Sequence, residues 1–151
     1  MPLMVERVAN LKTPEECAMF EKNVLERGRP DLAIAARKRA LELRAQKYGA
    51  STEPERQCLE AVYAYESVLS ARNGKATRDL RTWQLIKRHG IIGAIERTVA
   101  RPAEATGHEA LLALGLEDYA FEVVIVRHRD LFSASAVECA QARIDEWTNA
   151  A

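Results

Sequence analysis

Two short segments of this chain carry the residue pattern that begins an α-helix. Thr13-Pro14-Glu15-Glu16 and Thr52-Glu53-Pro54-Glu55 each place a capping hydroxyl three residues before a glutamate, with a proline in the first turn. After each segment, apolar residues recur at intervals of three and four residues, which is the spacing of one helical face. The sequence therefore predicts two long helices, and similar spacing continues along most of the chain.

Glycine, proline and Asn-Gly signals divide the rest of the chain into further helices. We expect helices over about 14–27, 31–48, 53–72, 78–88, 91–100, 109–114, 117–127 and 134–147. Thr77 and Ser133 are the expected caps of the fourth and last helices. A strand over 121–126 is the alternative for the apolar part of the seventh helix. The predicted fold is all-α: a compact bundle of about seven short to medium helices that begins with an antiparallel helical hairpin.

Composition places the chain among ordinary globular proteins. Its 151 residues are 48% hydrophobic and 29% charged, so we expect one α-helical domain over 1–151 with its own core. Glu6 and Arg7 interrupt the first apolar residues, and no apolar run approaches the ~20 residues of a membrane-spanning helix. Three widely spaced cysteines suggest free thiols rather than disulfides. We therefore expect a cytoplasmic protein that does not contact membranes.

Residues 14–47 resemble a single tetratricopeptide-type helical hairpin. Gly28, Ala33, Ala40 and Leu41 keep the spacing of that family. Glu21 and Arg37 depart from it, since the family has a small residue at the first position and a large apolar residue at the second. No second copy follows 34 residues later, so the resemblance implies one helical hairpin and not a stacked peptide-binding array.

The charge of the chain is zero overall but is divided unevenly between two segments. The basic segment, residues 72–101, holds eight basic residues (Lys or Arg) and only two acidic residues (Asp or Glu), a net charge of +6. The acidic segment, residues 102–151, holds three basic and nine acidic residues, a net charge of −6. Such a basic segment indicates either an anionic partner or a surface that the acidic segment neutralises.

Helical spacing predicts that the basic side chains face outward. Arg81 and Arg88 fall on the side of the fourth helix opposite Trp83 and Ile86, and Arg78 falls on the same outward side. Two short helices that break at His89-Gly90 and present basic residues are typical of a helix-turn-helix that contacts DNA phosphates. The predicted nucleic-acid-binding residues are Lys75, Arg78, Arg81, Lys87, Arg88, Arg97 and Arg101.

The first hypothesis is therefore a non-catalytic protein that binds nucleic acid, preferably DNA. The alternative is a helical protein–protein interaction module or regulatory adaptor, which includes a homo-oligomer, and the third is an unrecognised enzyme. Glu117, Asp118, Glu122 and His128 are the acid–base cluster that an enzyme could use. The three histidines lack metal-ligand spacing, so we predict no metal ligand, no cofactor and no catalytic residue.

Overall fold

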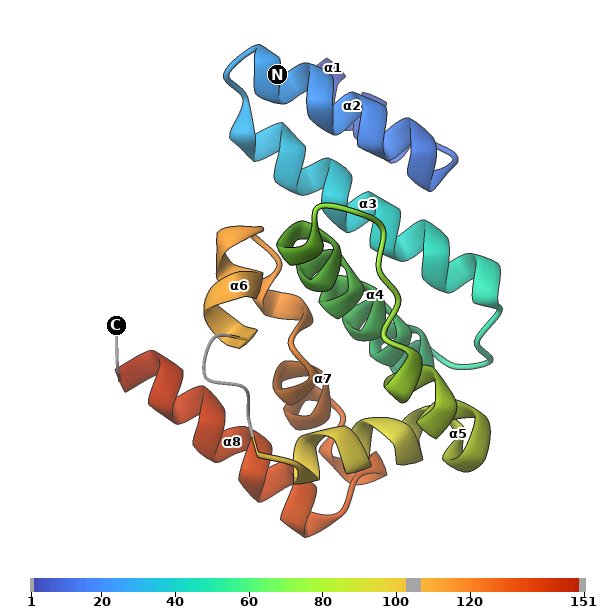
Figure 1. Cartoon of the computed structure of the whole chain (residues 1–151), viewed down its shortest axis with the longest axis vertical. Coiled ribbons are helices and arrows are strands. Elements are labelled where there is room, and N and C mark those ends of the chain that lie inside the picture. Colours follow the sequence, from blue (N-terminus) through green and yellow to red (C-terminus); the bar gives the residue numbers. More distant parts are fainter. Residues whose placement is uncertain (1, 103–106, 150–151) are drawn as a thin grey trace. The chain divides into compact units, whose positions relative to one another are not determined.

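The structure is a computed structural model that describes residues 2–102 and 107–149, and all regular secondary structure in these ranges is helical (Figure 1). The α-helices are α1 (Pro2–Ala9), α2 (Pro14–Glu26), α3 (Pro30–Tyr48), α4 (Glu53–Asn73), α5 (Leu80–Ala100), α6 (Gly107–Ala113), α7 (Phe121–Arg127) and α8 (Ala134–Asn149). Two short 3-10 helices, η1 (Glu117–Tyr119) and η2 (Arg129–Leu131), precede and follow α7. The all-α prediction is confirmed, and the strand considered for 121–126 is the helix α7.

The chain divides into two compact units, Met1–Ala50 and Ser51–Ala151. In the first unit α2 and α3 pack against each other as the predicted hairpin, and α1 also contacts α3. One cluster of buried residues joins this hairpin and α1, and it consists of Val8, Phe20, Val24, Leu32, Ala33 and Ala36. That the two units fold as one domain stays a prediction.

Both predicted threonine caps form. The Thr13 hydroxyl accepts a hydrogen bond from the Glu16 N–H at 3.1 Å, at the start of α2. The Thr52 hydroxyl accepts one from the Glu55 N–H at 3.3 Å and donates to the Glu55 carboxylate at 3.1 Å, at the start of α4. Each contact satisfies a backbone donor that the helix itself leaves without an acceptor.

The two positions that depart from the tetratricopeptide pattern are bonded to each other. Arg37 on α3 donates from Nε to the Glu21 carboxylate on α2 at 2.9 Å, and both side chains are partly buried. A polar pair across the hairpin thus takes the place that a small and a large apolar residue occupy in that family.

In the second unit α4 contacts α5, α6 and α7, and α8 contacts α5 and α7. The largest fully buried side chains of this unit include Leu59, Val62, Val68, Ile95, Val99, Leu111, Leu116, Val124 and Ile125. Leu116 precedes η1 and the others lie on α4, α5, α6 and α7, whereas α8 contributes the small buried residues Ala136 and Ala140. This core holds the ends of α5, the helix that carries most of the basic segment.

The helices differ from the prediction at three places. Helix α1 was not expected from the sequence, because its eight residues carry no capping signal. The helix expected over 117–127 is divided at Ala120, which is extended with φ −61° and ψ 144°. Helix α5 begins at Leu80 and not at 78, since Asp79 is its cap and accepts from the Thr82 N–H at 3.2 Å.

Thr77, the expected cap, contacts the turn before α5. Its N–H donates to the Ser70 hydroxyl at 2.9 Å, and its own hydroxyl donates to the Lys75 carbonyl at 3.0 Å. Asp79 directly precedes the first residue of α5, so its carboxylate can reach the free N–H groups of the first turn. Ser133, in contrast, caps α8 as predicted, by accepting from the Ala136 N–H at 3.1 Å.

Candidate functional site

All seven predicted nucleic-acid-binding residues are exposed. Lys75 and Arg78 lie in the turn before α5, Arg101 lies directly after it, and the other four are on the helix. Arg81 and Arg88 are seven residues apart on α5, so they share a face as the sequence predicted.

Arg78 departs from that arrangement because it lies outside the helix. Its guanidinium is 5.0 Å from the centroid of the Trp83 ring, and its Nε is 3.7 Å from a carboxylate oxygen of Glu66. The prediction that Arg78 lies on the side opposite Trp83 is therefore wrong. Helical spacing places side chains only within a helix, and Arg78 precedes the first turn of α5.

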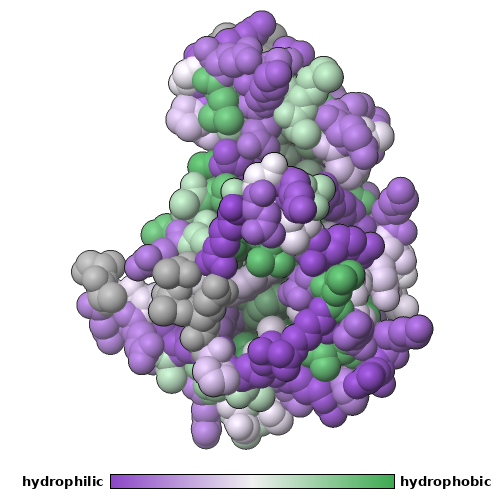
Figure 2. Space-filling model, in the orientation of Figure 1, coloured by the Kyte–Doolittle hydropathy of each residue, from purple (hydrophilic) through white to green (hydrophobic). Residues whose placement is uncertain are grey.

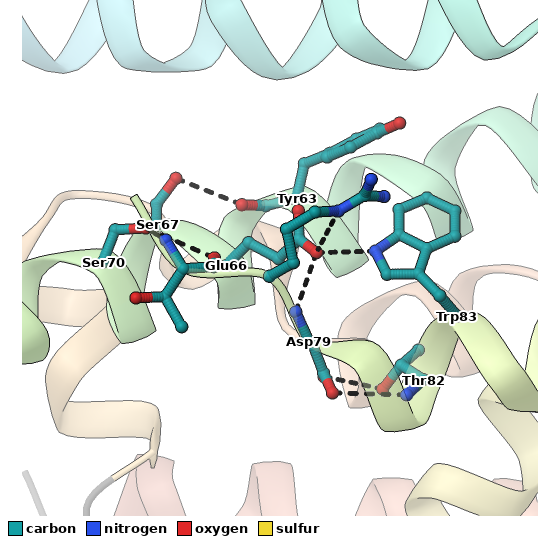
Figure 3. Close-up of polar contacts among 9 residues, drawn as sticks. Tyr63, Glu66, Ser67, Ser70, Asp79, Thr82 and Trp83 are labelled. Atoms are coloured by element: carbon teal, nitrogen blue, oxygen red, sulfur yellow. Dashed lines mark hydrogen bonds and ion pairs between the residues drawn. The ribbon is translucent and has the colours of Figure 1, made fainter. Parts of the chain in front are cut away.

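A buried carboxylate fixes the beginning of α5 (Figure 3). Glu66 on α4 is 5% exposed, and its Oε2 accepts from the Asp79 N–H at 2.9 Å and from the Trp83 Nε1–H at 2.6 Å. The Trp83 ring also packs against Tyr63 of α4, with centroids 5.4 Å apart. Glu66 thus ties α4, the turn and the first turn of α5 together, and we interpret it as a structural residue.

Helix α5 changes direction at one residue. Gly90 has φ 79° and ψ 173°, a backbone conformation that L side chains rarely adopt, whereas the residues before and after it are helical. A helix-turn-helix joins its helices by a turn of about three or four residues, so this segment is a kinked helix and differs from that motif. Glu96, beyond the kink, accepts a hydrogen bond from the Ser133 N–H at the start of α8.

The acidic segment does not cover the basic one in the described residues. Among residues 2–102 and 107–149, none of the seven basic side chains forms an ion pair with an acid that follows residue 102. The ion pair that the acidic segment does form is internal, between Arg143 and Glu122.

Two of the seven residues, Arg81 and Arg101, line a cavity of about 400 Å³ in the second unit. Arg143 of α8 lies in the same wall, where its Nη1 donates to Glu122 at 3.0 Å and its Nη2 donates to the Arg101 carbonyl at 2.6 Å. The side chains of Arg143 and Glu122 are only 14% and 8% exposed. This buried pair holds the end of α5 against α7 and α8.

Aromatic rings form much of the remaining wall. His108 and Trp147 stack with centroids 4.0 Å apart and planes 5° apart, and Tyr65 and Phe121 stack at 4.8 Å and 12°. These four rings and Arg143 were not predicted to lie beside the basic segment. They come from α4, α6, α7 and α8, and no motif in the sequence links such distant positions.

The four residues of the acid–base cluster are engaged in separate ways. Glu122 pairs with Arg143, whereas His128 lies 2.9 Å from the Gln57 amide oxygen, which also accepts from Arg127 at 2.8 Å. Asp118 is exposed, and of the four only Glu122 lines the cavity. Within the described residues, these four side chains form no hydrogen bond or ion pair with one another.

The three cysteines are free thiols, as predicted. Cys17 and Cys58 are buried, and Cys139 is half-buried. Burial raises the pKa of Cys58 to about 12 and also raises the pKa of Cys17. Burial thus keeps both thiols protonated at neutral pH.

Within residues 2–102 and 107–149, no three His, Cys, Asp or Glu side chains are grouped so that they could hold a metal ion. Over the same described part of the chain, none of the helices has the length and apolar composition to span a membrane. The sequence matches no protein-family model, and comparisons with curated proteins and with solved structures give no significant match.

Proposed function

We propose that this chain binds nucleic acid by contacting backbone phosphates with the basic side chains of α5 and its flanking residues. One observation carries the proposal: six of the seven predicted residues have no ion-pair partner in the part of the chain that the structure describes, Arg78 being the exception. The two acids within the basic segment are used in other ways, Asp79 as a helix cap and Glu96 as an acceptor for a backbone N–H.

Exposed cations without ion-pair partners are better suited to contacting backbone phosphates than to contacting base edges. Each Lys or Arg that neutralises a duplex phosphate releases condensed counterions, and this contribution does not depend on sequence. About four such contacts give a slope of log affinity against log salt near −3.6. We therefore expect weak binding that depends on salt and shows little sequence preference.

The test reverses Lys87 and Arg88 to glutamate together. Both side chains are exposed on α5, neither lines the cavity, and no hydrogen bond or ion pair involves them within the described residues. In a gel-shift titration at about 50 mM salt, the double variant should bind at least about tenfold more weakly than the wild type, with the salt slope reduced by about 1.8.

The matched control reverses Lys22 and Arg129, two exposed basic residues outside the basic segment, and so changes the net charge equally. It should retain most of the wild-type affinity. Absence of any complex with DNA or RNA at low salt, or an equal loss in the control, would make this proposal wrong and favour a protein partner.

The distribution of apolar surface gives the protein-partner alternative less support. Among the residues whose exposure the structure describes, 6–102 and 107–149, the exposed large hydrophobic residues are Met19, Leu25, Tyr48, Leu80, Leu112 and Leu131, and they lie on five different elements. On the face in Figure 2, hydrophobic residues form separate patches among hydrophilic ones. Protein-binding surfaces more often present one continuous apolar patch.

A further inference from the structure

We propose that the cavity in the second unit is a binding site for a phosphate monoester that carries a planar base, such as a nucleoside monophosphate. The same chemistry occurs in a free nucleotide and at the 5′-phosphorylated end of a nucleic-acid strand. The cavity shares Arg81 and Arg101 with the proposed phosphate-contacting residues, but Lys87 and Arg88, which test that proposal, do not line it. The inference is argued from the lining of the cavity and does not require that the chain binds a nucleic-acid backbone.

The size of the cavity suits a small molecule. Its volume of about 400 Å³ lies within the range of small-ligand sites, roughly 300–1,000 Å³. Its walls come from five helices and from the residues that follow α5, so the core of the unit fixes its shape. A site with walls on rigid elements binds with little loss of conformational entropy.

The charges in the cavity favour an anion. The two carboxylates that line it among the described residues already have partners in the protein, because Glu122 accepts from Arg143 and Asp79 accepts from the backbone and hydroxyl of Thr82. Arg81 and Arg101 line the same space, and neither has an ion-pair partner among residues 2–102 and 107–149. Two guanidinium groups balance the charge of a phosphate monoester, about −1.5 to −2 at neutral pH, and can bind its oxygens bidentately.

The rings favour a ligand with a flat apolar part beside the anion. Two stacked pairs, His108 with Trp147 and Tyr65 with Phe121, line the cavity that contains the arginines. Contact between aromatic side chains and bases contributes about 1–3 kcal/mol per base in proteins that bind single strands. Inorganic phosphate alone would leave this surface unused.

His108 supplies a second and independent indication of a ligand. Its Nδ1 is buried and has no hydrogen-bond partner among the described residues, although its ring forms part of the cavity wall. A buried polar atom without a partner is unfavourable by about 1–3 kcal/mol. A base carries donors and acceptors along its edge, and it can relieve this cost when that edge meets Nδ1 in the plane of the imidazole.

The experiment titrates the full chain with adenosine monophosphate, adenosine and inorganic phosphate by isothermal calorimetry. Adenosine monophosphate should bind more tightly than either of its parts. Arg101→Gln should weaken its binding about tenfold, the effect of losing one charged hydrogen bond. The folded state should survive this change, because the contact that Arg101 makes with Arg143 uses its backbone carbonyl and not its side chain.

Arg97→Gln is the matched control, since Arg97 lies four residues earlier, is exposed and does not line this cavity. It should leave the affinity unchanged within about twofold, a difference under 0.5 kcal/mol. A 5′-phosphorylated oligonucleotide that competes with adenosine monophosphate, where its unphosphorylated counterpart does not, would identify a strand end as the source of the ligand. If the phosphorylated oligonucleotide does not compete, the source of the ligand is a free nucleotide.

Three results would overturn the proposal. The first is that adenosine monophosphate does not bind at millimolar concentration. The second is that it binds no more tightly than inorganic phosphate. The third is that Arg97→Gln and Arg101→Gln weaken its binding equally. Lys87→Glu with Arg88→Glu should leave the affinity for adenosine monophosphate unchanged. Failure of this site is therefore distinguishable from failure of the phosphate-contacting face.

Discussion

Replacement of Glu66 tests whether one buried carboxylate holds the start of α5. Two donors, the Asp79 N–H and the Trp83 Nε1–H, share its Oε2 at 2.9 and 2.6 Å, and the side chain is almost fully buried. Glu66→Gln keeps a neutral acceptor but removes the charge from both bonds, a loss of about 1 kcal/mol each, so about 2 kcal/mol of unfolding free energy. Glu66→Ala leaves both donors without an acceptor and should cost more, about 2–4 kcal/mol for partly buried groups.

Chemical denaturation of the wild type and both variants, followed by circular dichroism, measures these differences. Glu138→Gln is the control, because Glu138 is exposed on α8 and has no partner among the described residues, so it should change stability by less than about 0.5 kcal/mol. A double-mutant cycle with Trp83→Phe should show that Glu66 and Trp83 are coupled. If Glu66→Gln is as stable as the control, or if the cycle shows no coupling, then Glu66 does not hold the start of α5.

The remaining predictions concern helix caps and thiols. Thr13→Ala, Thr52→Ala and Asp79→Ala should each lower the unfolding free energy by about 0.5–2 kcal/mol in urea titrations, because each removes the acceptor for a helix-terminal N–H. A native thiol reagent should label Cys139 before Cys58, and equal rates measured by mass spectrometry would contradict the observed burial. The pKa of Cys58 is raised from its ordinary value of 9.0 to about 12, so the unfolded chain loses this proton first and stability should fall as pH rises through that window. Cys58→Ala should remove that part of the pH dependence, and an unchanged curve of stability against pH would show that the thiol does not contribute.

Most of the fold was accessible to sequence reasoning because it depends on local signals. Capping hydroxyls, glycines and 3.6-residue spacing act within one or two turns, so the helices that begin after Thr13, Thr52 and Ser133 were predicted correctly. Errors occurred where two local signals compete. Thr77 and Asp79 are both good caps, and the choice between them depends on Glu66, which lies on another helix and binds the Asp79 N–H.

The candidate site was less accessible, for a physical reason. The basic residues of α5 are close together in sequence, so their excess charge was visible, and their exposure follows from helical spacing. The cavity, in contrast, combines Arg81 and Arg101 with Arg143 and with rings from four other helices. Such proximity results from packing between distant elements, which composition and spacing do not encode locally.

The same packing explains how a chain of zero net charge can leave a basic surface unneutralised. The acidic segment directs Glu122 inward to Arg143, the basic residue of its own helix α8, and Arg143 reaches the basic segment only through the Arg101 carbonyl. This contact is a hydrogen bond to the backbone, so it leaves the Arg101 guanidinium at the cavity. Removing one partner of an ion pair buried to this degree strongly destabilises the fold. Arg143 is therefore better suited to positioning Arg101 than to exchanging partners with a ligand. Anions that enter the cavity should accordingly bind Arg81 and Arg101 while the Arg143–Glu122 pair stays intact.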